Sequence, residues 1–229
     1  MVGLSKPLKI EWLNETASLI LDKNKKEEMK EKLNEYLSFE IDSPIVLRKT
    51  RELLINTWMT RSENCSELNE LALTLYYKRS PVLPLHWCML LVSYPIFSDV
   101  CALIGKISTI EESFTSTWIR EKLNELWGER ATVIDSVPHI LRTMVNLGVI
   151  EKERTSTYRI RKQRVSDEET IKLFIKTLFE LKQKAYYEVS EFSSVPQMFP
   201  FVFDVTYEMI YTMGDFSFAN FGGKRVLTK

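Results

Sequence analysis

The sequence predicts a mainly α protein with three parts: an N-terminal helical bundle (residues 1–94), a central winged helix-turn-helix (95–165), and a C-terminal helix with a small β-hairpin (166–229). Three observations support this fold class. Apolar residues recur at helical spacing through the first two thirds of the chain. Glycines follow two of the central helices, and two short alternating segments rich in arginine come after the second glycine.

Helical signals follow one another through the N-terminal part. Ser43-Pro44 predicts a helix start, because serine caps the free N–H groups and proline needs no hydrogen bond at the first position. This helix is expected to run to about Thr60, and further helices are expected around residues 68–75 and 86–92. The charged segment 25–39 is also expected to be helical, with an apolar face of Met29, Leu33, Tyr36 and Leu37.

The central part follows the order helix, helix, short turn, helix, hairpin. The first helix covers residues 97–106, with Ser98 as its expected N-cap. The second covers residues 115–127 and ends at Gly128, and the third covers residues 132–147 and ends at Gly148. Residues 149–154 and 157–161 then predict a β-hairpin, which completes the order of a winged helix-turn-helix. The second helix is expected to turn inward with Trp118, Leu123 and Leu126.

The C-terminal part begins with a helix that Ser166 is expected to cap. Acids in its first turn favour the positive end of the helix dipole, and the helix is expected to reach about Lys184. The tail is rich in aromatic and β-branched residues and predicts a terminal hairpin that turns at Gly222-Gly223. The sequence leaves open which part of the molecule this hairpin packs on.

Positive charge is concentrated in one short segment of a chain whose net charge is zero. Residues 1–129 contain 16 basic and 19 acidic residues, and residues 166–229 contain 7 and 9. Residues 130–165 contain 8 basic residues and only 3 acidic ones. A local basic patch on a neutral protein is typical of a nucleic-acid-binding surface.

The third central helix and the hairpin supply the candidate DNA-binding residues. Apolar residues at three- and four-residue spacing place small, polar and basic residues on the outer face of the helix, as a helix in a major groove needs. These residues are Ser136, His139, Arg142, Thr143 and Asn146. The hairpin is expected to reach phosphates or the minor groove with Lys152, Arg154, Arg159, Arg161, Lys162 and Arg164.

Strand alternation gives the hairpin an inner and an outer face. Tyr158 and Ile160 should pack against Met144 and Leu147, whereas Arg159 and Arg161 should be exposed. Winged helices also serve as protein–protein modules, and Glu151 and Glu153 dilute the charge of the hairpin. Two alternatives therefore stay open: an interaction scaffold that does not touch nucleic acid, and a dimeric transcriptional regulator.

The sequence lacks signatures of catalysis or cofactor binding. The two histidines, His86 and His139, have no histidine or cysteine partner at metal-ligand spacing, and residues 220–224 (NFGGK) do not form a phosphate-binding loop. We therefore expect a binding protein that is not an enzyme and has no cofactor or metal. His86 lies in an apolar helix and is expected to be a satisfied core residue.

Cysteine usage and apolar runs give an expectation about location. Cys65, Cys88 and Cys101 are odd in number and have no CxxC spacing, which predicts buried free thiols in a reducing compartment. The N-terminus has no apolar run typical of a signal peptide, and the apolar stretch 87–92 is too short to span a bilayer. We expect a soluble cytoplasmic protein with no membrane partner.

Two segments in the middle of the chain resemble the BrxA family of the bacterial BREX phage-defence systems. They are LPLHWCMLLVSYPIFSDVCALIGK (83–106) and WIREKLNELWGERATVIDSVPHILRTMVNLGVI (118–150), in which a helix end at 141–150 leads into the basic hairpin. The resemblance covers roughly a third of the chain. It implies a non-enzymatic accessory protein that binds double-stranded DNA, with other defence proteins as further partners. It carries over no catalytic residue.

Overall fold

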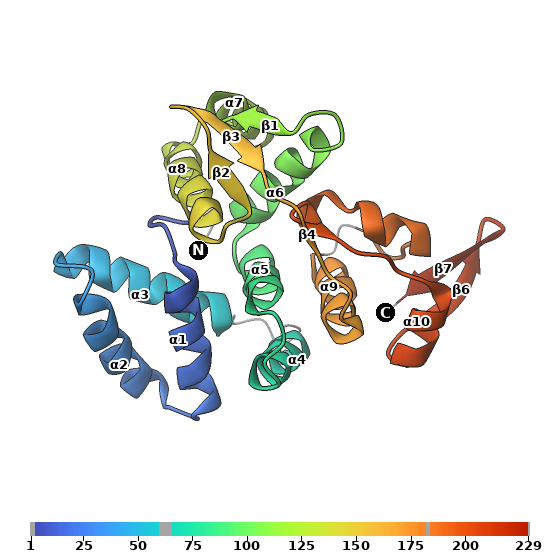
Figure 1. Ribbon diagram of the computed structural model, residues 1–229, viewed down its shortest axis with the longest axis horizontal. Coiled ribbons are helices and arrows are strands. Elements are labelled where there is room, and N and C mark those ends of the chain that lie inside the picture. The colour runs from blue at the N-terminus through green and yellow to red at the C-terminus, as the bar shows by residue number, and fades with distance from the viewer. Residues whose placement is uncertain (1–2, 60–65, 182–183, 229) are drawn as a thin grey trace.

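The computed structural model describes residues 3–59, 66–181 and 184–228 and is mainly helical (Figure 1). The α-helices are α1 (Ile10–Leu21), α2 (Lys26–Ser38), α3 (Pro44–Trp58), α4 (Ser66–Tyr77), α5 (Val82–Ser93), α6 (Pro95–Ile107), α7 (Ser116–Trp127), α8 (Ala131–Asn146), α9 (Glu168–Glu180) and α10 (Tyr207–Met213). The strands are β1 (Ser113–Thr115), β2 (Ile150–Lys152), β3 (Thr157–Ile160), β4 (Gln163–Arg164), β5 (Phe201–Val202), β6 (Ser217–Phe221) and β7 (Lys224–Thr228). Two 3₁₀ helices, η2 (Val189–Ser194) and η3 (Pro196–Met198), precede β5.

The helices α1, α2 and α3 form one lobe of the molecule (Figure 1). The predicted start of α3 is confirmed: the Val46 N–H donates to Ser43 Oγ at 3.5 Å, and Pro44 is the first helical residue. The helix predicted for residues 25–39 is also confirmed, because α2 buries Met29 and Leu33. The sequence reasoning did not identify α1.

One continuous cluster of buried apolar side chains extends through all three predicted parts of the chain, from Leu4 to Leu227. Helix α5 lies at its centre, and its buried residues occur all round the helix. A helix that is apolar all round is typical of a core position. The three predicted parts therefore share one apolar core.

The central part combines three helices with a three-stranded antiparallel sheet. Along the chain the order is α6, β1, α7, α8, β2, β3, and in the sheet β3 lies between β1 and β2. The predicted hairpin is confirmed, with Ile150 opposite Ile160. Strand β1 was not predicted; three residues are too short to give a periodic signal. The predicted helix ends are confirmed by Gly128 at φ 70° and Gly148 at φ 72°, a conformation that glycine adopts without a steric penalty.

Three local expectations were wrong. Ser98 does not cap α6, which begins at Pro95, so Ser98 is a buried residue inside the helix. Ser166 does not cap α9; Asp167 does, since its carboxylate accepts the Thr170 N–H at 2.9 Å. Leu126 does not turn inward and is 63% exposed, because it lies on the solvent side of α7.

The terminal hairpin packs back on the C-terminal part. Strands β6 and β7 pair as predicted, and the turn residues Gly222 and Gly223 have positive φ. The backbone of Leu227 exchanges two hydrogen bonds with that of Tyr187, at 2.7 and 3.1 Å. The Phe216 ring stacks on Phe179 of α9, with centroids 6.2 Å apart. These contacts place the hairpin against α9, away from the central sheet (Figure 1).

The structure shows how long the apolar helices are and where two of the three cysteines lie. There, no single helix is both long enough and apolar enough to cross a membrane; α5 and α6 reach that length together but are bent by 116°. Cys88 and Cys101 are buried and free, as predicted. Burial raises the pKa of the Cys88 thiol to about 12, so this thiol is protonated at neutral pH. Cys65 lies outside the described residues.

Candidate nucleic-acid interface

The outer face of α8 is less exposed than the sequence predicts. The inner face is as predicted, since Val133, Val137 and Ile140 are buried. Ser136 and Thr143 were expected to point outward, and this was wrong: they are 5% and 0% exposed. The other three predicted residues remain at the surface: Arg142 is exposed, and His139 and Asn146 are half-buried.

The chain segment before α1 covers the buried part of this face. The Leu8 N–H donates to Thr143 Oγ1 at 2.9 Å, and Asn146 Nδ2 donates to the Leu8 carbonyl oxygen at 2.8 Å. Gly3 packs so tightly that an added Cβ would lie 2.5 Å from Ser136 Oγ. Three of the five predicted helix residues therefore hold the N-terminal segment in place. Sequence periodicity could not reveal this, because the partners are about 135 positions apart.

Lys6 is a residue near this face that the sequence reasoning missed. Burial lowers the pKa of His139, and the positive charge of Lys6 lowers it further, whereas Asp135 acts in the opposite direction. The net shift is downward, so His139 is neutral at physiological pH. Lys6 adds a positive charge beside α8 that belongs to a different part of the chain.

The inner side of the β2–β3 hairpin packs on the core, but less deeply than predicted. Tyr158 and Ile160 are half-buried rather than fully buried, and both contact the main apolar cluster. The Tyr158 ring stacks on Phe114 of β1, with centroids 5.7 Å apart and an interplanar angle of 19°. Strand β1, which was not predicted, thus supplies part of the surface that holds the hairpin.

The outer side of the hairpin is exposed, but part of its charge is already compensated. Arg159 and Arg161 are exposed, as predicted. Arg159 Nε lies 2.6 Å from a carboxylate oxygen of Glu153, and Arg161 forms an ion pair with Glu151. These diagonal pairs across the hairpin lower the net charge that the two arginines present to solvent.

The remaining cations of the hairpin region fall into two groups. Lys152, Arg154 and Lys162 are exposed and form no ion pair with any described residue. Arg164 lies beyond the hairpin in β4, which pairs in parallel with β5, and its guanidinium lies 3.2 Å from Asp204. Arg164 is therefore on the connection to the C-terminal part and not on the hairpin, contrary to the expectation.

The hairpin loop is fixed to the start of α7. The Ser116 N–H donates to the Ser156 carbonyl oxygen at 2.9 Å, and Thr115 caps α7 by accepting the Trp118 N–H. Arg154, next to this loop, therefore projects from a backbone that is tied to the helices. A fixed backbone reduces the entropy that the hairpin would lose on binding a ligand.

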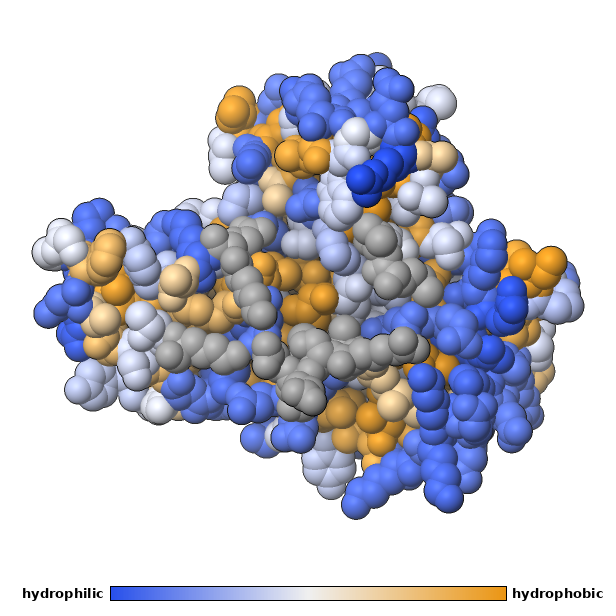
Figure 2. Space-filling view, turned by 180° about the vertical axis from the view of Figure 1, so that it is seen from behind, coloured by the Kyte–Doolittle hydropathy of each residue, from blue (hydrophilic) through white to orange (hydrophobic). Residues whose placement is uncertain are grey.

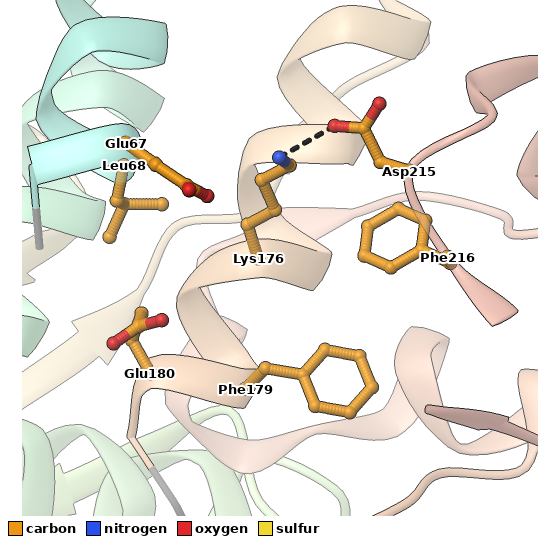
Figure 3. Close-up of a pocket in the computed structure, with 7 residues that line it drawn as sticks. All are labelled: Glu67, Leu68, Lys176, Phe179, Glu180, Asp215 and Phe216. Atoms are coloured by element: carbon orange, nitrogen blue, oxygen red, sulfur yellow. Dashed lines mark ion pairs between the residues drawn. The ribbon is translucent and has the colours of Figure 1, made fainter. Parts of the chain in front are cut away.

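A small hollow between α4, α9 and the chain before β6 is an alternative candidate site (Figure 3). Its volume is about 100 Å³, well below the roughly 300 Å³ of small ligand sites. Asp215 is held by Lys176 at 2.6 Å and by Lys172 at 3.0 Å. Burial raises the pKa of Asp215, but the hydrogen bonds from both lysines outweigh this and lower it overall. This cluster fixes the hairpin to α9 and leaves no room for a substrate.

His86 is a buried neutral side chain at the centre of the N-terminal part. Its Nε2 lies 2.7 Å from Asn14 Oδ1, and its Nδ1 has no hydrogen-bond partner in the described part of the chain. Burial lowers the pKa of His86 to about 3. The expected core position is confirmed, although only one ring nitrogen is satisfied. Among residues 3–59, 66–181 and 184–228, no three His, Cys, Asp or Glu side chains are grouped to hold a metal ion.

Comparison with known proteins adds no relative: no family model, no curated protein and no solved structure matches the chain significantly. The resemblance to the BrxA family stays a prediction.

Proposed function

We propose that the protein is a non-enzymatic accessory protein of a bacterial phage-defence system of the BREX type, and that it binds double-stranded DNA with little sequence preference. The observation that carries this proposal is the basic hairpin on the central part. Three exposed cations there, Lys152, Arg154 and Lys162, have no acidic partner among the described residues. Uncompensated cations on a fixed surface suit a polyanion, because each one that meets a phosphate releases a bound counterion.

The arrangement of the central part supports a winged helix. The chain order α6, β1, α7, α8, β2, β3 and the sheet order β1-β3-β2 place one hairpin beside the last of three helices. In a winged helix the hairpin next to that helix forms the wing, and the helix itself approaches the DNA. The wing assigned here is the hairpin 150–160 with the following Lys162.

The covered face of α8 accounts for the low sequence preference in this proposal. Base reading requires hydrogen-bonding side chains that reach base edges in a groove. Thr143 and Asn146 already bond to Leu8, and Ser136 is buried under Gly3. Arg142 is the one residue of the five predicted helix residues that is exposed and not half-buried or buried. Contact with phosphates is therefore favoured over base recognition, which argues against a regulator that reads one palindrome.

The proposal is tested by fluorescence anisotropy of random-sequence duplex DNA over a range of salt concentrations. The triple variant Lys152→Ala/Arg154→Ala/Lys162→Ala should bind more weakly and should lower the slope of log K against log salt by about 2.7 in magnitude. The double variant Arg159→Ala/Arg161→Ala is the matched control, because Glu153 and Glu151 already compensate these arginines. Its slope should change less per residue. Absence of binding by the wild type to any duplex at low salt would rule the proposal out.

A second candidate function, a protein–protein scaffold, is favoured by a separate observation. Aromatic side chains are exposed on α10 and the terminal hairpin, with Tyr211 at 73% and Phe221 at 60%. The Tyr211 ring stacks on Phe218, with centroids 6.1 Å apart. Exposed aromatic groups of this kind are enriched at protein interfaces. A scaffold predicts that the wild type binds no duplex DNA in the anisotropy experiment.

A further inference from the structure

The N-terminal segment joins α8 to a second basic surface, on α3. On one side Leu8 bonds to Thr143 and Asn146 of α8. On the other side Ser5 lines a depression of about 380 Å³ together with Arg48 and Lys49 of α3. Figure 1 shows the segment running from the N-terminus between α8 and α3 into α1. The segment therefore brings a face of α3 next to the face of α8.

Positive charge runs along this whole junction. Arg142 is exposed and lies one helical turn from both His139 and Asn146, which places it at the edge of the covered face of α8. Lys6 is close enough to His139 to lower its pKa. On α3, Arg48 and Lys49 are exposed.

Among the described residues, the acidic groups of this region form no ion pair with these four cations, although Glu35 and Asp42 line a second depression together with Arg48. Glu52, which lines the same depression, is paired with Arg51 at 2.7 Å. Asp135, near the start of α8, acts on His139 but forms no ion pair within the described residues. Arg142, Lys6, Arg48 and Lys49 likewise form no ion pair there. A surface that carries several cations without ion-pair partners attracts anions.

We propose that these four residues, the basic strip, bind backbone phosphates of duplex DNA and extend the contact made by the wing. This inference rests on the proposed function. The strip suits phosphates, because it offers two ammonium groups and two guanidinium groups at the surface, and the depression beside Arg48 and Lys49 is open to solvent. It also gives the covered face of α8 a role: the segment that blocks base reading supplies a cation for the backbone.

The Arg48→Ala/Lys49→Ala variant tests the strip on the full-length protein. With random-sequence duplex DNA, its slope of log K against log salt should be smaller than that of the wild type by about 1.8 in magnitude, and its binding at low salt should be weaker. The Arg48→Lys variant, which keeps the charge, should retain the wild-type slope. Both residues are exposed, so the urea midpoint should not change, and a shared midpoint shows that each variant is folded.

The matched control is Lys26→Ala/Lys78→Ala, which removes the same charge from two exposed lysines outside the strip. The slope of log K against log salt for this control should equal that of the wild type. If both double variants lowered the slope equally, the effect would come from net charge and not from the strip, and the inference would be overturned. An unchanged slope for Arg48→Ala/Lys49→Ala, with a reduced slope for the wing triple variant, would overturn the strip and leave the proposed function standing. No duplex binding by the wild type would remove both, and an acidic protein would then be the better partner for the strip.

Discussion

The outer face of α8 and the outer face of the β2–β3 hairpin have similar side chains in the sequence but opposite surroundings in the fold. Polar groups of α8 hold the N-terminal segment, and Thr143 is 0% exposed. The hairpin stays open to solvent, although two of its arginines are paired with glutamates on the neighbouring strand. Polar residues at outward positions of a helix are therefore no guarantee of a free surface, because a distant segment can use them as hydrogen-bond partners.

Figure 2 shows the molecule from behind, coloured by hydropathy. Mainly hydrophilic side chains cover the lobe of α1 to α3 and the top of the lobe that contains α7 and β3, with apolar groups in small spots. The large exposed apolar side chains of the first lobe include Phe39 at 82% and Ile45 at 63%, at the turn between α2 and α3. The lobe of α1 to α3, which carries Arg48 and Lys49, and the C-terminal hairpin β6–β7 lie at opposite ends of the molecule (Figure 1).

The largest expected effect is a loss of stability when the contact between the N-terminal segment and α8 is weakened. Leu8→Ala should lower the free energy of unfolding by about 2 to 5 kcal/mol, because Leu8 is fully buried and its truncation leaves a cavity. Urea denaturation measures this change. Thr143→Val, which keeps the shape but removes the hydroxyl that accepts the Leu8 N–H, should cost about 1 to 3 kcal/mol. Wild-type stability in both variants would show that the segment does not cover α8 in solution.

A smaller change in the free energy of unfolding is expected from substitutions in the β2–β3 hairpin. Ile160→Ala should lower the free energy of unfolding by about 1 to 2 kcal/mol. This is less than the loss expected for a fully buried isoleucine, because Ile160 is half-buried opposite Ile150. Arg159→Ala is the matched control on the adjacent position and should change stability by no more than about 0.5 kcal/mol, since exposed ion pairs contribute little. The two urea midpoints would contradict the register of the hairpin if Arg159→Ala unfolded the protein and Ile160→Ala did not.

The smallest expected effect is on the pKa of His139, which lies on α8 near Lys6 of the N-terminal segment. Lys6→Ala should raise the pKa of His139, because the positive charge of Lys6 disfavours the imidazolium form. Proton NMR titration of the imidazole signals measures this shift. The chain has two histidines, and His86 titrates near pH 3, so the signal that titrates closer to neutral pH belongs to His139. An unchanged pKa in Lys6→Ala would place Lys6 away from α8.

Local sequence signals predicted much of the fold. Ser43-Pro44, Gly128 and Gly148 marked helix boundaries correctly, because capping and positive φ depend on the residue itself. The hairpin register followed from alternation, and the exposed arginines followed with it. The failures involve contacts between distant segments. The buried state of Thr143 depends on Leu8, and the compensation of Arg161 depends on its neighbour across the hairpin, Glu151.

The candidate site could be predicted only in outline for the same reason. Net charge located the basic segment, but the difference between a free and a paired cation depends on tertiary structure. Lys152 and Arg159 look alike in the sequence, yet one is free among the described residues and the other is bound to Glu153. Arg48 and Lys49 lie in a segment with no charge excess, so composition gave no reason to connect them with the hairpin.

Amide hydrogen exchange with and without random-sequence duplex DNA tests most directly whether the wing binds while α8 stays covered. On addition of DNA at low salt, amides of the hairpin region 150–164 should exchange more slowly. The Leu8 amide, which donates to Thr143, should exchange no faster than in the free protein. Faster exchange at Leu8 together with new protection of α8 would contradict the account, because it would mean that DNA displaces the N-terminal segment and reads the helix beneath it.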